Sequence, residues 1–113
     1  MFEKLFPKKV KDKYIQRFWR DFSDRAALFV NILQNDERDS EDFIWMQNLV
    51  GKSLKLCCLD STVGYDFSFE TQREPVRLVF YHKNDDYLKK VGEKLTQFYP
   101  ENLKGVVDFT VAE

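Results

Sequence analysis

The sequence predicts an α+β fold built as a two-layer sandwich, in which helices pack on one face of a small, mostly antiparallel sheet of about three strands in the order 2-1-3. Three observations predict this fold. Apolar residues recur with helical spacing up to residue 58, they alternate with polar residues from residue 65 to 81, and both patterns return once before the C-terminus. The length of 113 residues, with 43% hydrophobic residues, suits one domain with one core over residues 1–113.

The first helix is predicted to begin after Pro7, whose missing N–H costs nothing in the first turn of a helix. Residues 1–7 are expected to precede it as a flexible lead. The apolar residues that follow with helical spacing are Val10, Tyr14, Phe18, Phe22, Phe29 and Leu33. Ser23 and Asp24 could cap a second helix, so the sequence leaves open whether this helix continues or breaks near residue 23.

A second helix is predicted after the polar connection over residues 35–42, with Asp39 or Ser40 as its N-cap. The positions predicted to face the core are Phe43, Met46, Leu49 or Val50, Leu54 and Cys57. Gly51 costs about 1 kcal/mol inside a helix, and the apolar residues between positions 53 and 59 also alternate as in a strand. We favour a helix over residues 42–58 and keep the strand as the alternative.

Two strands follow, and a hairpin is their simplest pairing. In the segment 65–70 one side carries Tyr65, Phe67 and Phe69, and the other carries Asp66, Ser68 and Glu70. The segment 76–81 comes after the polar residues 71–75. Its core-facing side is predicted to carry Val76, Leu78 and Phe80, and its opposite side Arg77, Val79 and Tyr81.

A third helix and a last strand complete the predicted fold. Asn84 is predicted to cap the helix, and Pro100 prevents the helix from continuing. Its buried stripe consists of Leu88, Val91, Leu95 and Phe98. After Gly105 the last strand alternates Val107, Phe109 and Val111 with Asp108 and Thr110. A right-handed crossover through this helix can place the last strand beside the first, which gives the order 2-1-3.

Several short segments carry a resemblance to a known group of proteins. They are Phe18-Trp19-x-x-Phe22, Arg77-Leu78-Val79-Phe80, and Val91-Gly92-Glu93-Lys94-Leu95 leading to Tyr99-Pro100. With them the chain resembles a group of small uncharacterised bacterial α/β domains that open with an FW-x-x-F helix. It departs from that group at His82-Lys83-Asn84, where a small residue and Gly are usual, and at Gly105-Val106, which replaces a Gly-Trp-like pair. The resemblance supports the helix over residues 42–58 and implies no activity, because no chemistry is established for the group.

Charge is divided unevenly along the chain. Residues 1–20 hold 7 basic and 2 acidic residues, a net of +5, and the remainder holds 11 and 17, a net of −6. A basic amphipathic start is typical of a solvated helix face, and the alternative is peripheral contact with an anionic membrane through Phe2, Leu5 and Phe6. Since no apolar run reaches the roughly 18 residues of a membrane span, we expect a cytoplasmic protein without a transmembrane segment.

The sequence contains no motif for catalysis or for a cofactor. Glycine stands only at positions 51, 64, 92 and 105, so a glycine-rich phosphate loop cannot form. The lone His82 and the adjacent Cys57 and Cys58 do not supply a standard zinc site, and the acidic residues between positions 36 and 42 suit helix capping better than calcium binding. We therefore predict no cofactor, no metal and no enzymatic activity, with a thiol activated by His82 as the open alternative.

The remaining candidate sites lie on the sheet. The uncovered face is predicted to be a protein-interaction surface, for a second copy in a homodimer or for another protein, formed by Asp66, Glu70, Arg77, Val79, Tyr81 and Asp108. Its acidic residues and the pI of about 5.9 speak against a nucleic-acid partner. The competing hypothesis is a small enzyme or ligand binder whose pocket at the strand ends contains Tyr81 and His82.

The chain contains two tryptophans, one in each of the first two predicted helices. Trp19 and Trp45 each lie one position away from the main apolar stripe of their helix. This position is typical of a residue at the edge of the core, and the alternative is an anchor in a protein interface.

Overall fold

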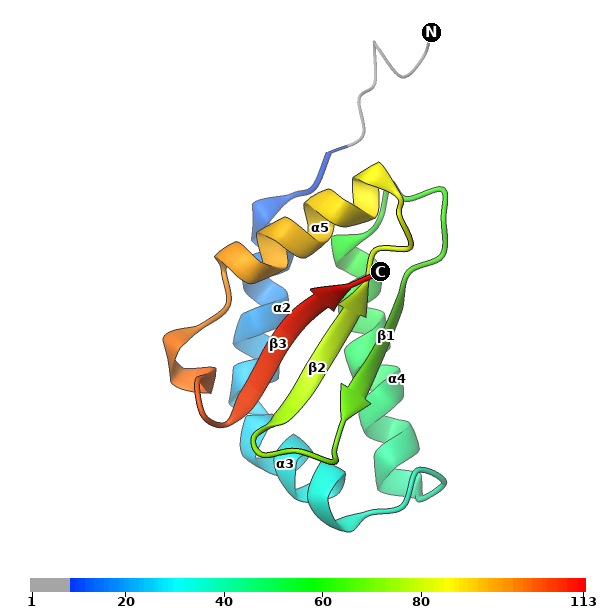
Figure 1. The fold of residues 1–113 in the computed structure, drawn as a ribbon. Coiled ribbons are helices and arrows are strands. Elements are labelled where there is room, and N and C mark those ends of the chain that lie inside the picture. The colour runs from blue at the N-terminus through cyan, green and yellow to red at the C-terminus, as the bar shows by residue number, and fades with distance from the viewer. Residues whose placement is uncertain (1–8) are drawn as a thin grey trace, which may run out of the picture.

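A computed structural model describes residues 9–113 of the chain as helices on one face of a three-stranded sheet (Figure 1). In chain order its elements are α2 (Asp12–Asp24), α3 (Ala26–Asn35), α4 (Glu41–Cys57), β1 (Asp66–Glu70), β2 (Val76–Tyr81), α5 (Asp86–Gln97), the short 3-10 helix η1 (Glu101–Leu103) and β3 (Val107–Ala112). The predicted α+β class is confirmed. The expected flexible lead over residues 1–7 lies outside the described residues. The predicted helix start directly after Pro7 is wrong, because residues 9–11 are not helical and α2 begins at Asp12 after Lys11 in an extended conformation.

The strand order is β1-β2-β3, so the predicted order 2-1-3 is wrong. The hairpin pairing is confirmed, since β1 and β2 are antiparallel with Ser68 opposite Val79, but β3 runs parallel to β2 and makes the sheet mixed. The physical reason lies in β2, which buries Leu78 on the helix side and Val79 on the other side. A strand with apolar residues on both faces is most stable in the centre of a sheet, and the crossover through α5 therefore returns to its free edge.

The sequence left open whether the first helix breaks near residue 23, and the structure shows a break at Arg25. α2 ends at Asp24, Arg25 takes a non-helical conformation, and α3 begins at Ala26. Arg25 is the N-cap of α3 and makes no side-chain capping bond, while Ser23 remains inside α2. The caps predicted from Ser23 and Asp24 are therefore not used.

Two further helix caps define α4 and α5. The Oγ of Ser40 accepts a hydrogen bond from the N–H of Phe43 at 3.1 Å, as predicted, and α4 continues through Gly51, which excludes the strand alternative. The predicted cap of α5 is wrong by one residue, because the Oδ2 of Asp85 accepts from the N–H of Leu88 at 3.0 Å. Asn84 has a φ of 58° and belongs to the left-handed turn that precedes the cap.

Trp19 lies inside the core and joins three elements of the fold. Its side chain is 2% exposed, and its Nε1 donates to the backbone oxygen of Leu95 in α5 at 2.9 Å. The indole also makes T-shaped contacts with the rings of Tyr99 and Phe109, at centroid distances of 5.5 and 5.1 Å. The prediction of a residue at the edge of the core is therefore wrong for Trp19, because the indole fills the space where α2 meets α5 and β3.

Two glycines occupy helix interiors with different surroundings. A Cβ added to Gly92 in α5 would lie 2.8 Å from the Cγ1 of Val111, closer than atoms in contact can be. A Cβ added to Gly51 in α4 would lie 3.5 Å from the Cε1 of Phe67, an ordinary contact distance. Only Gly92 is thus required by the close approach of a helix to the sheet.

This difference predicts opposite effects of two otherwise identical substitutions. We expect Gly51→Ala to stabilise the fold by about 0.5–1 kcal/mol, because alanine favours the helix. We expect Gly92→Ala to destabilise it by about 1–3 kcal/mol, because Val111 must move. Urea denaturation measures both, and Val111→Ala should remove most of the cost of Gly92→Ala. Equal effects of the two glycine substitutions in the wild-type background would contradict the close contact.

Candidate functional site

One face of the sheet carries no layer of described residues, and we refer to it as the open face (Figure 1). The register aligns its side chains in three rows across β1, β2 and β3. These rows are Asp66, Tyr81 and Ala112; Ser68, Val79 and Thr110; and Glu70, Arg77 and Asp108. The structure thus brings together all six residues that the sequence assigned to the candidate interaction surface.

Polar pairs hold the side chains of the open face in place. The hydroxyl groups of Ser68 and Tyr81 share a hydrogen bond of 2.8 Å, and the Nη1 of Arg77 lies 3.1 Å from the Oε1 of Glu70. This second contact confirms the expected pairing of Glu70 with Arg77 across the hairpin. These neighbours leave Val79 only 3% exposed, so the centre of the face is apolar and shielded by polar groups.

Arg73 is a residue of the open face that the sequence analysis missed. Its Nη1 lies 2.9 Å from the Oδ2 of Asp108, and both side chains are about one third exposed, at 32% and 34%. Arg73 belongs to the connection between β1 and β2, and Asp108 follows 35 residues later in β3. No local pattern could have indicated this contact, because it depends on β3 lying next to β2.

The structure separates the two residues of the predicted pocket. Tyr81 points to the open face, where it bonds Ser68, whereas His82 lines a shallow hollow beside α5 with Gly92 and Val111. The Nδ1 of His82 accepts a hydrogen bond from the backbone N–H of Asn84 at 2.9 Å. The expectation that Tyr81 and His82 share a pocket is therefore wrong, because consecutive residues of a strand point to opposite faces.

The two cysteines are buried, free thiols. The Sγ of Cys57 donates to the backbone oxygen of Tyr14 at 3.5 Å, which fixes it between α4 and α2. Burial raises the pKa of both thiols to about 12, and for Cys57 the neighbouring Cys58 adds to the shift. A thiol with this pKa stays protonated at neutral pH, so neither cysteine is an activated nucleophile.

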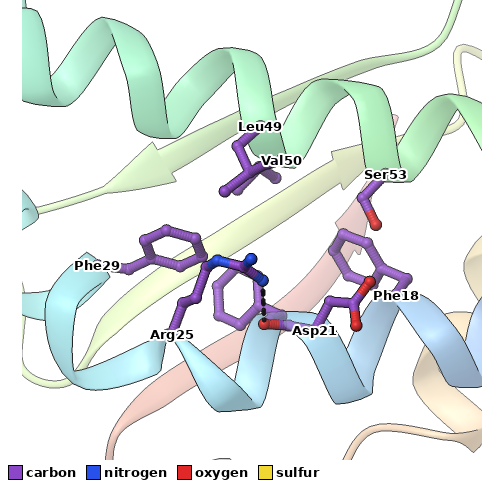
Figure 2. Close-up of a pocket in the computed structure, with 8 residues that line it drawn as sticks. Phe18, Asp21, Arg25, Phe29, Leu49, Val50 and Ser53 are labelled. Atoms are coloured by element: carbon purple, nitrogen blue, oxygen red, sulfur yellow. Dashed lines mark hydrogen bonds between the residues drawn. The ribbon is translucent and has the colours of Figure 1, made fainter.

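A cleft opens between α4 and the bend that joins α2 to α3 (Figure 2). It has a volume of about 110 Å³, with an apolar wall formed by Phe18, Phe22, Phe29, Leu49 and Val50. Asp21, Arg25 and Ser53 also line it, and the Nη1 of Arg25 donates to the backbone oxygen of Asp21 at 3.4 Å. Since sites for drug-sized ligands measure roughly 300–1,000 Å³, this cleft is too small for such a ligand.

Trp45 packs against one wall of this cleft and keeps a large exposed surface. Its ring meets that of Phe29 at a centroid distance of 6.4 Å, and 45% of the residue is exposed. Trp45 is therefore an exposed residue that meets the core at the ring of Phe29, rather than the predicted residue at the edge of the core. Its alternative role as an interface anchor remains a prediction.

Over residues 9–113 no three His, Cys, Asp or Glu side chains come together as possible metal ligands, and no helix there has the length and apolar character needed to cross a membrane. No protein-family model, curated protein or solved structure matched the chain. The resemblance to small bacterial α/β domains therefore remains a prediction.

The buried thiols predict a loss of stability at alkaline pH. The pKa of Cys57 and Cys58 rises from about 9 to about 12 on folding. Between these values the unfolded chain releases thiol protons that the folded chain retains. The free energy of unfolding therefore falls with rising pH, by up to about 1.4 kcal/mol per pH unit for each thiol.

Urea denaturation at a series of pH values from neutral to alkaline tests this expectation. The variant that combines Cys57→Ala and Cys58→Ala should lose stability less steeply above pH 9 than the wild type does. Part of the slope should persist, because burial also raises the pKa of Tyr65, Tyr87 and Tyr99. Identical slopes in variant and wild type would contradict the assignment to the thiols.

Proposed function

We propose that this chain is a non-enzymatic protein-interaction module that binds a second copy or another protein through the open face of its sheet. The observation that carries the proposal is the organised, uncovered surface around Val79 and Tyr81, framed by the pairs Glu70–Arg77 and Arg73–Asp108. Because Val79 itself is only 3% exposed, the accessible part of this surface consists of Tyr81, the arginines and their polar partners, and Tyr and Arg are enriched in protein interfaces.

Pre-organisation of the open face supports the proposal. Binding usually costs about 0.5–1.5 kcal/mol for each flexible side chain that an interface immobilises. Tyr81 is already held by Ser68, and Arg77 by Glu70, before any partner is present. A partner that meets this face therefore has less side-chain entropy to overcome.

The alternatives have weaker support. An enzyme that uses Tyr81 and His82 has little support, because Tyr81 bonds Ser68 on the open face whereas His82 lines a different hollow. Membrane contact through the basic N-terminal segment depends on Phe2, Leu5 and Phe6, which lie outside the described residues, and on α2 the charge of Asp21 lies within 4 Å of both Arg17 and Arg20. The proposal places the module in the cytoplasm, where a reducing environment would preserve its free thiols.

Light scattering after size exclusion tests the self-associating form of the proposal. We expect Tyr81→Asp to raise the Kd for association about tenfold or more, because it removes the aromatic residue of the open face and adds a second carboxylate beside Asp66. Gln47→Asp, at an exposed position of α4, introduces the same charge on the helix side and should leave association unchanged. A wild type that stays monomeric at high concentration, or equal effects of the two variants, would refute association through the open face.

A further inference from the structure

The two outer edges of the sheet differ in how their backbone groups are satisfied. In β1 the residues Phe67 and Phe69 direct their N–H and C=O groups away from β2. The N–H of Phe67 donates to the Oδ1 of Asp66 at 2.8 Å, and the oxygen of Phe69 accepts from Arg38 at 3.4 Å. Side chains thus block part of the β1 edge, which is how natural sheets discourage pairing with another strand.

The β3 edge lacks this protection over its last residues. The oxygen of Ala112 accepts from the N–H of His82, so Ala112 faces β2, and by alternation Phe109 and Val111 direct their backbone groups outward. Val107 also faces outward, and its oxygen accepts from the hydroxyl of Tyr99 at 2.6 Å. Within residues 9–113 the N–H and C=O groups of Phe109 and Val111 have no hydrogen-bond partner.

A shallow hollow of about 510 Å³ lies beside this same edge. It is lined by Val111 and by residues of α5, among them Lys89, Gly92 and Glu93. Gly92 packs directly against Val111, and the open volume of the hollow lies beside this contact, next to Val111 and the outer residues of α5. The edge therefore offers unsatisfied backbone groups together with room for the side chains of an added strand.

We propose that β3 pairs with β3 of a second copy of this chain, antiparallel and centred on Thr110, to form one continuous six-stranded sheet. With Thr110 opposite Thr110 of the second copy, Phe109 stands opposite Val111 in both directions. These two pairs exchange four hydrogen bonds, which satisfy every outward N–H and C=O group of Phe109 and Val111 in both chains. A two-fold axis thus matches the pattern of free groups on the edge.

The side chains of β3 are complementary to themselves in this register. On the open face Thr110 meets Thr110, and Asp108 meets Ala112, so no two like charges lie opposite each other. On the helix side an aromatic residue meets a β-branched one, Phe109 against Val111, a favourable cross-strand pair. Lys89 and Glu93, the charged residues beside the hollow, have opposite signs. These matches favour a second copy over an unrelated strand as the occupant.

Edge pairing goes beyond the proposed function and does not depend on it. It joins two open faces into one surface twice as wide, which would allow a partner to be bound by both copies at once. Thr110 belongs to both surfaces, since it lies beside Val79 on the open face and at the proposed two-fold axis. Tyr81 lies on β2, away from the β3 edge, so Tyr81→Asp is the variant that separates the two proposals.

A charge-swap experiment at the axis tests the pairing. Opposite residues at a site of this kind have Cβ atoms about 4.5–5.5 Å apart, so like charges there repel strongly. We expect Thr110→Asp to raise the Kd of the dimer about tenfold or more, and Thr110→Lys to do the same. An equimolar mixture of the two variants should dimerise again as a heterodimer. Size exclusion with light scattering measures all three samples, and circular dichroism confirms that each variant folds.

The possible outcomes separate this inference from the proposed function. Dimers that respond to the Thr110 variants, recover in the mixture and ignore Tyr81→Asp support edge pairing alone. Dimers that respond to Tyr81→Asp but not to the Thr110 variants overturn edge pairing and leave the open face as the contact. A wild type that remains monomeric at millimolar concentration, or variants that fail to recover when mixed, also overturns it.

Discussion

The hydrogen bond and ring contacts of Trp19 are the interaction on which the rest of the structure depends. The indole donates to the backbone of Leu95 and meets the rings of Tyr99 and Phe109, so one side chain fixes α2 against α5 and β3. Buried N–H groups are costly when unpaired, which gives this contact a directional part besides its apolar burial. The position of β3 relative to the helices is thereby defined.

The position of α5 then determines which face of β3 is covered. Gly92 allows α5 to approach Val111 closely, and this approach places α5 on the helix side of β3. The other side carries no helix in the described part of the chain, so its residues satisfy one another across the strands. The open face is therefore uncovered because α5 packs on the other side of the sheet. The β3 edge is uncovered because no strand lies beyond β3 within residues 9–113.

The reactive side chains of the described residues are either buried or already hydrogen-bonded. The thiols of Cys57 and Cys58 are buried and kept protonated, and the ring of His82 accepts a hydrogen bond from a neighbouring backbone group. The cleft that Phe29 lines has a volume of about 110 Å³, and the larger hollow of about 510 Å³ beside His82 is shallow. The open face, with its pre-organised polar pairs, and the β3 edge, with its unpaired backbone groups, are the features that we propose for interaction with proteins.

The sequence by itself determined the strands, the last helix and the cap at Ser40, because strand alternation, helical spacing and capping are local properties of the chain. It also determined which side chains share the open face, since alternation within each strand suffices for that. It left open the break between α2 and α3 and the strand alternative at the end of α4. Only the tertiary structure decided the central place of β2, the pairing of Arg73 with Asp108, and the separation of Tyr81 from His82. These features depend on which strand lies beside which, and that choice is made by packing between residues far apart in the sequence.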